Sequence, residues 1–250
     1  MAAELGRAAG EGLPRAARVA VIAALASERV GLDTMPRGAV YIDVLQSGPG
    51  PARARAAARA AVAAGANALV AWGLAGGLVP RLRPGDVVLP ERGFSIGGPE
   101  WRAAPRWHAA LERALGGAFR VHTGTLVSVA EVLASPVAKR TAAESCGATA
   151  VDMESAAIAA VAAGAGIPCV AVRIVADTSV DSLPDDIGKW IDASGRRRLL
   201  PLLGTVVAPA QWPMLMRLAS RHRAARRTLA ALAERLVPSG FQFAPAAAQS

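Results

Sequence analysis

The stretch from Val151 to Asp186 limits the fold strongly, because it predicts a helix followed by a buried strand and carries carboxylates at both ends. Asp152 and Glu154 lie near the start of the predicted helix, where negative side chains suit the positive end of the helix dipole. After Pro168, the apolar and β-branched run Cys169–Val175 is typical of a strand buried on both faces. A helix that leads into such a strand is the crossover unit of an α/β sheet.

Asp177 follows this predicted strand almost directly. Ligands of open α/β sheets bind at the carboxyl ends of the strands, so a carboxylate at this position is a candidate for acid-base chemistry. The position is also typical of a turn or capping residue, and taken alone it favours that role.

The order of residues in this stretch resembles the signature half of the nucleoside phosphorylase and nucleosidase superfamily, which includes the methylthioadenosine/S-adenosylhomocysteine nucleosidases. The matching segments are Val-Asp-Met-Glu-Ser-Ala-Ala from Val151, Gly-Ile-Pro from Gly166, and Val-Arg-Ile-Val-Ala-Asp ending at Asp177. The resemblance implies an α/β fold in a single three-layer domain, with a central mixed β-sheet of barrel-like curvature flanked by helices. It makes Asp177 the acid that protonates the purine leaving group at N7.

The superfamily resemblance also assigns the sugar site. Glu154 is expected to accept hydrogen bonds from the ribose hydroxyls, and Met153 to line the sugar pocket, with Asp152 beside them in the substrate site. Ala176 stands where a serine often precedes the catalytic aspartate, so we expect a hydrogen bond that tunes this acid to be missing.

A first buried strand is predicted at Val19–Leu25, and Glu28 follows it. Nucleosidases of the superfamily have a similar strand that leads to a glutamate, which activates the attacking water, and the resemblance gives Glu28 that role. Without it, a glutamate in the first turn of a helix would be the simpler interpretation. The run after Arg18 also resembles a short signal peptide, but Glu4 and Glu11 argue against a positive leader.

The predicted strand Ala68–Trp72 is followed by the glycine-rich segment Gly73–Leu78, which allows a close approach of backbone to ligand. The segment lacks the Gly-Lys-Ser/Thr ending of a P-loop. It resembles the superfamily motif Gly-Ser-Ala-Gly-Gly-Leu, so Gly76 and Gly77 are expected at the substrate.

Two departures in this region concern the nucleophile. Leu74 stands where the family commonly has serine, and Ala71 where hexameric bacterial phosphorylases place a phosphate-binding arginine. An apolar pair cannot hold a phosphate dianion. Water is therefore favoured, and phosphate stays an alternative co-substrate, because an arginine from elsewhere, including a neighbouring subunit, could bind it.

The middle of the chain supplies further elements of the predicted fold. Strands are expected at Tyr41–Leu45 and Val121–Val129, and a helix at 52–64. The Gly/Pro turn at 47–50 resembles a turn near the nucleophile site of the family, although a plain turn fits equally well. For 94–117 the prediction is a loop and a helix whose tryptophans only pack.

The loop that binds the base in the superfamily usually contains Gly-Asp and a stacking aromatic residue. Ser128–Val132 stands in its place without either feature. An aliphatic surface is therefore expected at the base, with Val132 as the nearest neighbour.

Length and composition favour one domain, since 250 residues with 53% hydrophobic residues are typical of a large α/β fold. The domain is predicted at 18–237, after a flexible lead-in at 1–17 and before a disordered tail at 238–250. The two cysteines and three histidines show no metal-ligand spacing, so no metal site, no cofactor and a reducing, cytoplasmic location are expected. The net charge of +9 comes mostly from arginine, and a compositional bias explains it better than an acidic partner; no nucleic acid partner is predicted.

A basic amphipathic helix is predicted at about 211–236, with leucines on one stripe and arginines on the other faces. Such a helix either packs on the domain or a partner subunit, or rests on an anionic membrane. Packing is the favoured interpretation. The membrane alternative would give a peripheral location at the inner membrane surface.

The chain resembles the hopanoid-associated phosphorylases in three features taken together: this basic extension, the aliphatic base loop and the segment from Val151. The resemblance implies cleavage of the N-glycosidic bond of adenosylhopane, with release of adenine, by a homo-oligomer that is expected to be a dimer. Two alternatives stay open: a methylthioadenosine/S-adenosylhomocysteine nucleosidase, and a catalytically silent module that binds a nucleoside lipid, since a fold alone does not establish activity.

Overall fold

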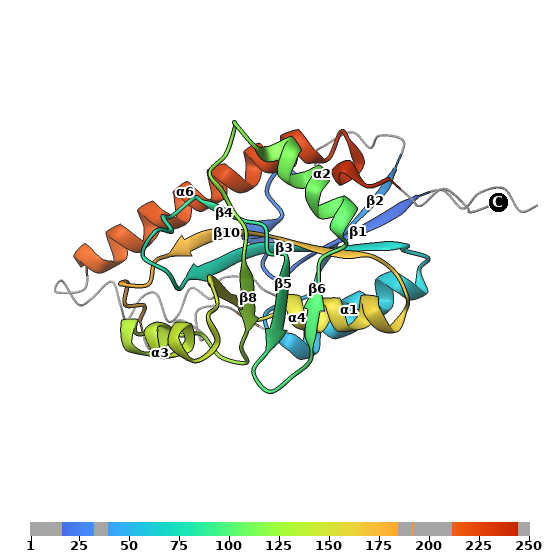
Figure 1. Cartoon of the computed structure of the whole chain (residues 1–250). Coiled ribbons are helices and arrows are strands. Elements are labelled where there is room, and N and C mark those ends of the chain that lie inside the picture. The colour runs from blue at the N-terminus through green and yellow to red at the C-terminus, as the bar shows by residue number, and fades with distance from the viewer. Residues whose placement is uncertain (1–16, 33–39, 185–191, 193–211, 245–250) are drawn as a thin grey trace, which may run out of the picture.

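The computed structural model describes residues 17–32, 40–184, 192 and 212–244. Across these residues, ten strands form one mixed sheet with helices on both sides (Figure 1). The strands are β1 (Arg18–Ala23), β2 (Tyr41–Gln46), β3 (Ala68–Gly77), β4 (Val87–Val88), β5 (Arg92–Ser95), β6 (Glu100–Arg102), β7 (Val121–His122), β8 (Thr125–Ser128), β9 (Ala150–Asp152) and β10 (Cys169–Asp177). The helices are α1 (Pro51–Ala63), α2 (Pro105–Leu115), α3 (Pro136–Cys146), α4 (Ser155–Gly164) and α6 (Trp212–Leu236), with 3₁₀ turns η1 (Ala26–Glu28) and η4 (Gly240–Gln242). The predicted α/β fold with a mixed central sheet is confirmed.

The sheet branches at β3. One edge of this strand pairs with β10 along its length, whereas the other edge pairs first with β1 and then, from Gly76, with the antiparallel β9. Beyond β9 follow β8, β5 and β6, which run across the direction of β1, β3 and β10 in Figure 1. The second half of β3 therefore lies where the two parts of the sheet meet.

Two layers of helices cover the sheet. In Figure 1, α2 and α6 lie on one side, and α1 and α4 lie side by side on the other. The buried face of α1 consists of Ala54, Ala58 and Ala61, whose small side chains allow close approach to α4 and β1. Alanine-rich sequence thus serves both helix propensity and tight packing.

Three predicted boundaries differ from the structure. Asp152 ends strand β9 instead of starting a helix, and its carboxylate accepts a hydrogen bond from the backbone of Ser155, at the start of α4 (2.9 Å). The segment Gly73–Gly77 continues β3 and is not a loop. The strand expected at Val121–Val129 is broken into β7 and β8 by Gly124, whose φ of 128° favours glycine.

The range 94–117 was predicted as a loop and a helix, but its first part also forms strand structure, because β5 and β6 pair as a hairpin. Its Trp101 and the Trp107 of α2 are buried in the core, in agreement with the packing role predicted for them.

The C-terminal helix occupies almost the range predicted for it. Its stripe of Ala225, Leu229, Leu232 and Leu236 is fully buried, and α6 packs on β10. The packing interpretation therefore holds for this half of the helix. The side chains of its first residues lie outside the described part of the chain.

The tail was predicted to begin at residue 238, but the chain still packs on the core just after this point. Phe241 is fully buried, packs edge-on against Trp72 with ring centroids 5.7 Å apart, and accepts a hydrogen bond at its backbone oxygen from Trp107 (2.7 Å). The segment after Pro238 was predicted to be disordered, but its side chains Phe241 and Phe243 pack against the core. The rest of the tail, 245–250, and the lead-in 1–16 lie outside the described residues.

No helix within the described ranges is long and apolar enough to cross a lipid bilayer.

Candidate active site

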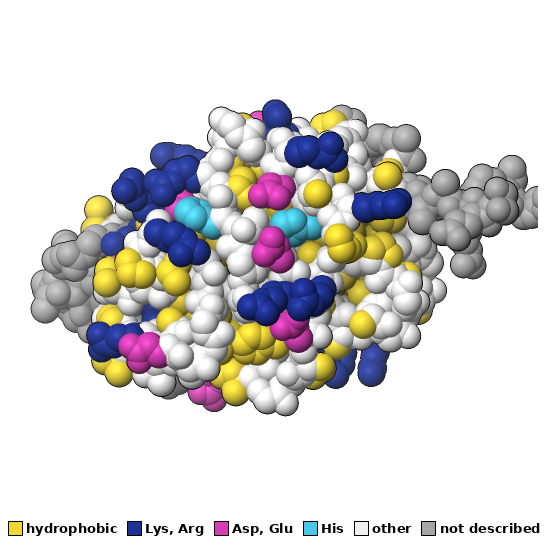
Figure 2. Space-filling model, viewed as in Figure 1, with side chains coloured by type: hydrophobic (Ala, Val, Ile, Leu, Met, Phe, Trp, Pro, Cys, Tyr) yellow, Lys and Arg dark blue, Asp and Glu magenta, His cyan; other side chains and the backbone are white. Residues whose placement is uncertain are grey.

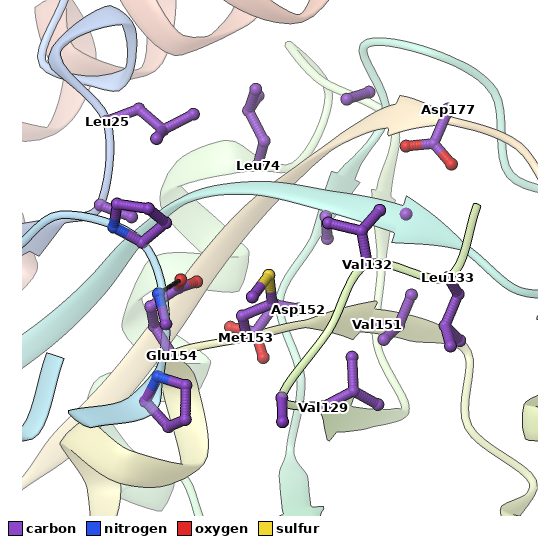
Figure 3. Close-up of a pocket in the computed structure, with 18 of the residues that line it drawn as sticks. Leu25, Leu74, Val129, Val132, Leu133, Val151, Asp152, Met153, Glu154 and Asp177 are labelled. Carbon is purple, nitrogen blue, oxygen red and sulfur yellow. Dashed lines mark hydrogen bonds between the residues drawn. The ribbon is translucent and has the colours of Figure 1, made fainter. Parts of the chain in front are cut away.

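A cavity of about 530 Å³ opens beside the second half of β3. Its walls come from β3, β9, β10 and the segments after β1, β2 and β8 (Figure 3). The cavity brings together most of the residues that the sequence assigns to the site: Glu28, Gly76, Val132, Asp152, Met153, Glu154 and Asp177. Gly77 does not line it, because this residue faces Leu82 in the core. In Figure 3, Glu154 and Asp177 lie at opposite ends of the cavity, with Met153 and Val132 between them.

Asp177 is aimed at the cavity by a β-bulge at the end of β10. The pairing with β3 shifts between Val175 and Asp177, so Ala176 and Asp177 both line the cavity although they are consecutive residues. Gly76 makes room for this carboxyl group, since a Cβ there would lie 3.3 Å from Asp177 Oδ2. Burial raises the pKa of Asp177, and the charge and hydrogen bond of Lys139 oppose that rise. A buried carboxyl group with a raised pKa is suited to donate a proton near neutral pH.

Glu28 is held by the backbone around it. Its Oε2 accepts hydrogen bonds from the amides of Ala24 and Leu25 (2.9 and 2.8 Å), and its Oε1 accepts one from Leu74 (2.8 Å). Trp72 Nε1 donates to its carbonyl oxygen (2.9 Å) and fixes the turn η1. Burial raises the pKa of Glu28, while Arg173 and the three amides favour the ionised form. Glu28 is thus a rigid carboxyl group at the cavity wall.

Gly73 explains how Glu28 comes so close to β3. Its φ is 147°, and a Cβ at this position would lie 2.6 Å from Glu28 Oε1 and 2.8 Å from an Arg173 nitrogen. Glu28 therefore lies against β3 at Gly73 and Leu74, and Asp177 lies against it at Gly76. Two to three residues along a strand separate these points by about 7–10 Å. A glycosidic bond can lie between the two carboxyl groups.

Glu154 lies at the other end of the cavity, immediately before α4. Its Oε1 accepts a hydrogen bond from the backbone amide of Gly50 (2.7 Å), in the turn after β2. This contact places the Gly/Pro turn at the cavity, beside the carboxyl group assigned to the sugar, and its expected place near the nucleophile stays a prediction. Burial, followed by the charge of Asp152, raises the pKa of Glu154 to about 7. The group is therefore poised between an acceptor and a donor of hydrogen bonds at neutral pH.

Asp152 stabilises the wall of the cavity through buried contacts. Its side chain is fully buried, and it pairs with Arg173 (2.6 Å) while accepting hydrogen bonds from Ser128 Oγ (2.5 Å) and the Ser155 amide. The role assigned to it, direct contact with substrate, fits this geometry less well than the orientation of Arg173. Arg173 in turn donates to Ser155 Oγ (2.9 and 3.1 Å).

Two charged residues of the site escaped the sequence analysis. Arg173 lies within the apolar strand β10, and an arginine in such a strand requires buried partners, which was a signal of its role. Lys139 is one of only two lysines in an arginine-rich chain, lines the cavity and is 1% exposed. Its position on α3 gave no periodic or motif signal.

The remaining wall of the cavity is aliphatic. Leu25, Leu74, Val129, Val132 and Leu133 line it, in keeping with the expected aliphatic surface at the base (Figure 3). Ala71 is fully buried in the core and does not reach the cavity. In the part of the chain that the structure describes, no group of His, Cys, Asp and Glu side chains is arranged to hold a metal ion.

The sequence model of the Phosphorylase superfamily matches residues 37–199, which is more than half of the chain. The chain belongs to the phosphorylase superfamily. The matched region includes Gly50, the glycines of β3, Glu154 and Asp177, whereas Glu28 precedes it. The superfamily assignment made from the sequence is therefore confirmed. A search of curated proteins gave no match.

Solved nucleosidase structures share the fold of this superfamily member. A methylthioadenosine/S-adenosylhomocysteine nucleosidase of Neisseria meningitidis, in complex with methylthio-immucillin-A, aligns with a TM-score of 0.70 and 20% identity over 89% of this chain and 99% of that one. The S-adenosylhomocysteine nucleosidase of Streptococcus pyogenes gives 0.67 and 19% over 90% and 99%. The futalosine hydrolase of Helicobacter pylori gives 0.67 and 15% over 88% and 99%.

Proposed function

We propose that this protein cleaves the N-glycosidic bond of a purine nucleoside and releases adenine. The observation that carries the proposal is the pair of buried carboxyl groups, Glu28 and Asp177, held at separate points of one cavity with Glu154 at its far end. The coarser assignment to the nucleosidase and nucleoside phosphorylase enzymes is supported by the superfamily match and by the shared fold.

Each of the three carboxyl groups has a different role in the proposed reaction. Asp177 protonates the base at N7 as the glycosidic bond breaks through an oxocarbenium-like transition state. Glu154 accepts hydrogen bonds from the ribose hydroxyls, and Glu28 orients or deprotonates the nucleophile. The aliphatic wall around Val132 contacts the base.

Water is the nucleophile that we propose. The apolar residues Ala71 and Leu74 provide no phosphate ligand, and the amides of Leu74 and Ala24 are already bound to Glu28. Arg53 lines the cavity and is exposed, so phosphorolysis stays the alternative that the assay must test.

Adenosylhopane is the substrate that the sequence resemblance favours, and we propose it here. An aliphatic cavity open to solvent suits a nucleoside that carries a large apolar group, whereas methylthioadenosine or S-adenosylhomocysteine is the substrate named for two of the structural relatives. Retention of both Glu28 and Asp177 disfavours a silent binding module, because binding alone does not need a carboxyl group on each side of the bond.

Contact with a membrane would suit a lipid-linked substrate. The outer face of α6 carries the exposed arginines Arg223, Arg226, Arg227 and Arg235, and basic side chains gather on this part of the surface in Figure 2. We propose that this face binds anionic lipid while the leucine stripe packs on the core.

We also propose a homodimer, since the exposed Ile96 and the alanines of α4 border a second, largely apolar cavity of about 930 Å³.

The deciding experiment is an adenine-release assay with adenosine, methylthioadenosine and a lipid-linked adenosine, each with and without phosphate. We expect release without phosphate and the highest kcat/KM for the lipid-linked substrate. Strict dependence on phosphate would exclude water as the nucleophile. Release from none of the three would contradict the proposed function.

A further inference from the structure

Lys139 lies in an unusual environment for a lysine. It extends from α3 into the protein with 1% of its surface exposed, and it lines the same cavity as Asp177. Its Nζ contacts Asp177 Oδ2 and also donates to the backbone oxygens of Thr178 (2.9 Å) and Asp181 (3.0 Å). Three acceptors match the three N–H groups of an ammonium, so the geometry fits the protonated side chain.

The contact with Asp177 determines how this carboxyl group is presented. The residue before it is Ala176, which has no side-chain hydroxyl to orient the acid. Lys139 binds Oδ2 from the α3 side, and Gly76 leaves the space on the β3 side open. The carboxyl group is thereby held by Lys139 on one side and has room beside Gly76 on the other.

Two other charged groups face Asp177. Asp181, in the segment after β10, raises the pKa of Asp177, and Arg221 of α6 lowers it. Arg221 and Asp181 are themselves an ion pair, so their effects on Asp177 oppose each other. Lys139 is the charged group in direct contact with the acid.

We propose that Lys139 is a positioning residue for bond cleavage, which holds Asp177 at the leaving group and stabilises the carboxylate that proton donation leaves behind. This inference rests on the proposed function. As the C–N bond breaks, its electron pair goes to the base, the O–H bond of Asp177 breaks, and an N–H bond forms on the base. The negative charge that remains on Asp177 then lies beside the ammonium, which keeps its own protons. A cation already in place stabilises that charge without reorganisation.

A purely structural role makes a different prediction. Lys139 also joins α3 to the segment Thr178–Asp181, so its loss could merely loosen the cavity. Loosening would slow every substrate alike. Loss of acid assistance would slow only those substrates whose leaving group needs a proton.

The test compares two ribosides in the full-length protein. One is the best nucleoside of the adenine-release assay, and the other is 4-nitrophenyl riboside, whose leaving group departs as a stable phenolate. The variants are Lys139→Met and Lys139→Gln, of which the second retains an N–H donor for the backbone oxygens if the first folds poorly. Arg140→Gln is the matched control, since Arg140 is the exposed next residue of α3.

We expect kcat for the nucleoside to fall about 10- to 100-fold in both variants, and kcat for the nitrophenyl riboside to change by less than about threefold. Equal losses on both substrates, or none on the nucleoside, would overturn the inference. A wild-type protein that cleaves neither riboside would instead refute the proposed function.

The pH profile gives a second, independent result. Because Lys139 lowers the pKa of Asp177 against the effect of burial, its removal lets that pKa rise. Asp177 must be protonated to act, so the alkaline limb of kcat for the nucleoside moves to higher pH in Lys139→Gln and stays in place in Arg140→Gln. An alkaline limb that is unchanged in Lys139→Gln would contradict the role of the ammonium.

Discussion

The site residues are carboxyl groups of one chemical type that differ in what surrounds them. Glu28 is bound by three backbone amides, Glu154 by one amide beside a second carboxylate, and Asp177 by a buried lysine. Burial raises the pKa of all three. In the proposed mechanism, these different partners suit Glu28 to act as a base, Glu154 as a hydrogen-bond acceptor and Asp177 as an acid.

Substitution of Asp177 by Asn tests the acid. The amide keeps the shape of the side chain but has no carboxylic proton to donate, so kcat for adenine release should fall by about 100-fold or more. Substrate affinity should change little. Steady-state kinetics at neutral pH measure both values, with Asp43→Asn, a carboxylate of β2 outside the cavity, as the control. Near-normal turnover in Asp177→Asn would return this residue to a turn role.

Substitution of Glu154 by Gln tests the effect of burial on stability. The pKa of Glu154 is about 7 in the fold and near 4.5 when exposed, so the wild-type protein loses stability as pH rises through that window. Glutamine does not ionise. The variant should therefore exceed the wild type in unfolding free energy by about 1–3 kcal/mol at pH 8 and match it at pH 4.

Urea unfolding across pH 4–8 measures this difference. Glu144→Gln removes the same charge from an exposed position of α3 and should leave the pH dependence unchanged. A parallel offset of Glu154→Gln at every pH would show that ionisation of Glu154 is not the cause.

At the level of the elements, β3 organises the site. Its first half is a core strand between β1 and β10, and its second half supplies the glycines against which Glu28 and Asp177 lie. The structural requirement differs between the two glycines. Gly73 needs both its positive φ and its lack of a side chain, whereas Gly76 needs only the space.

The substitution Gly73→Ala should therefore damage both fold and function. A methyl group would displace Glu28 or Arg173 from their positions 2.6–2.8 Å away, and the backbone conformation is unfavourable for alanine. We expect a loss of about 2–4 kcal/mol in unfolding free energy and at least a ~10-fold loss of kcat. Gly164→Ala, in open space on α4, is the control and should cost nothing. Wild-type stability in Gly73→Ala would mean that β3 relaxes around the methyl group.

For the whole molecule, the far end of the chain supports the site. Leu229 and Leu232 of α6 and Phe241 complete the core, and Phe241 contacts Trp72, which holds the turn that carries Glu28. The basic face of α6 is left exposed by this packing. Packing accounts for the leucine stripe, and membrane contact of the arginine face stays a prediction.

Vesicle binding tests the exposed face. With about 1 kcal/mol available per basic residue near an anionic surface, the full chain should co-sediment with anionic vesicles at low salt and dissociate as salt is raised. Replacement of Arg223, Arg226 and Arg227 by Gln should abolish binding without lowering the melting temperature, because these side chains are exposed. If the wild-type chain does not bind anionic vesicles at low salt, the role of α6 is purely structural.

The sequence alone determined the α/β class and, through its resemblance to known motifs, the superfamily and several carboxyl groups of the cavity, because Glu28, Glu154 and Asp177 stand in ordered motifs beside strands with a clear apolar pattern. It also determined the C-terminal helix, whose leucine stripe repeats at helical spacing. These features are local, and local periodicity and spacing are what a sequence displays directly.

Only the tertiary structure decided the roles that depend on contacts between distant segments. Lys139 meets Asp177 across 38 residues, Gly50 meets Glu154 across 104, and Trp107 meets Phe241 across 134. The same packing paired Asp152, at the cavity wall, with Arg173 and brought Phe241, after Pro238, into the core. The physical reason is burial. A charged or aromatic side chain acquires its role when the fold removes it from water and places it beside a particular partner. The residues next to it in the sequence specify neither that partner nor the burial.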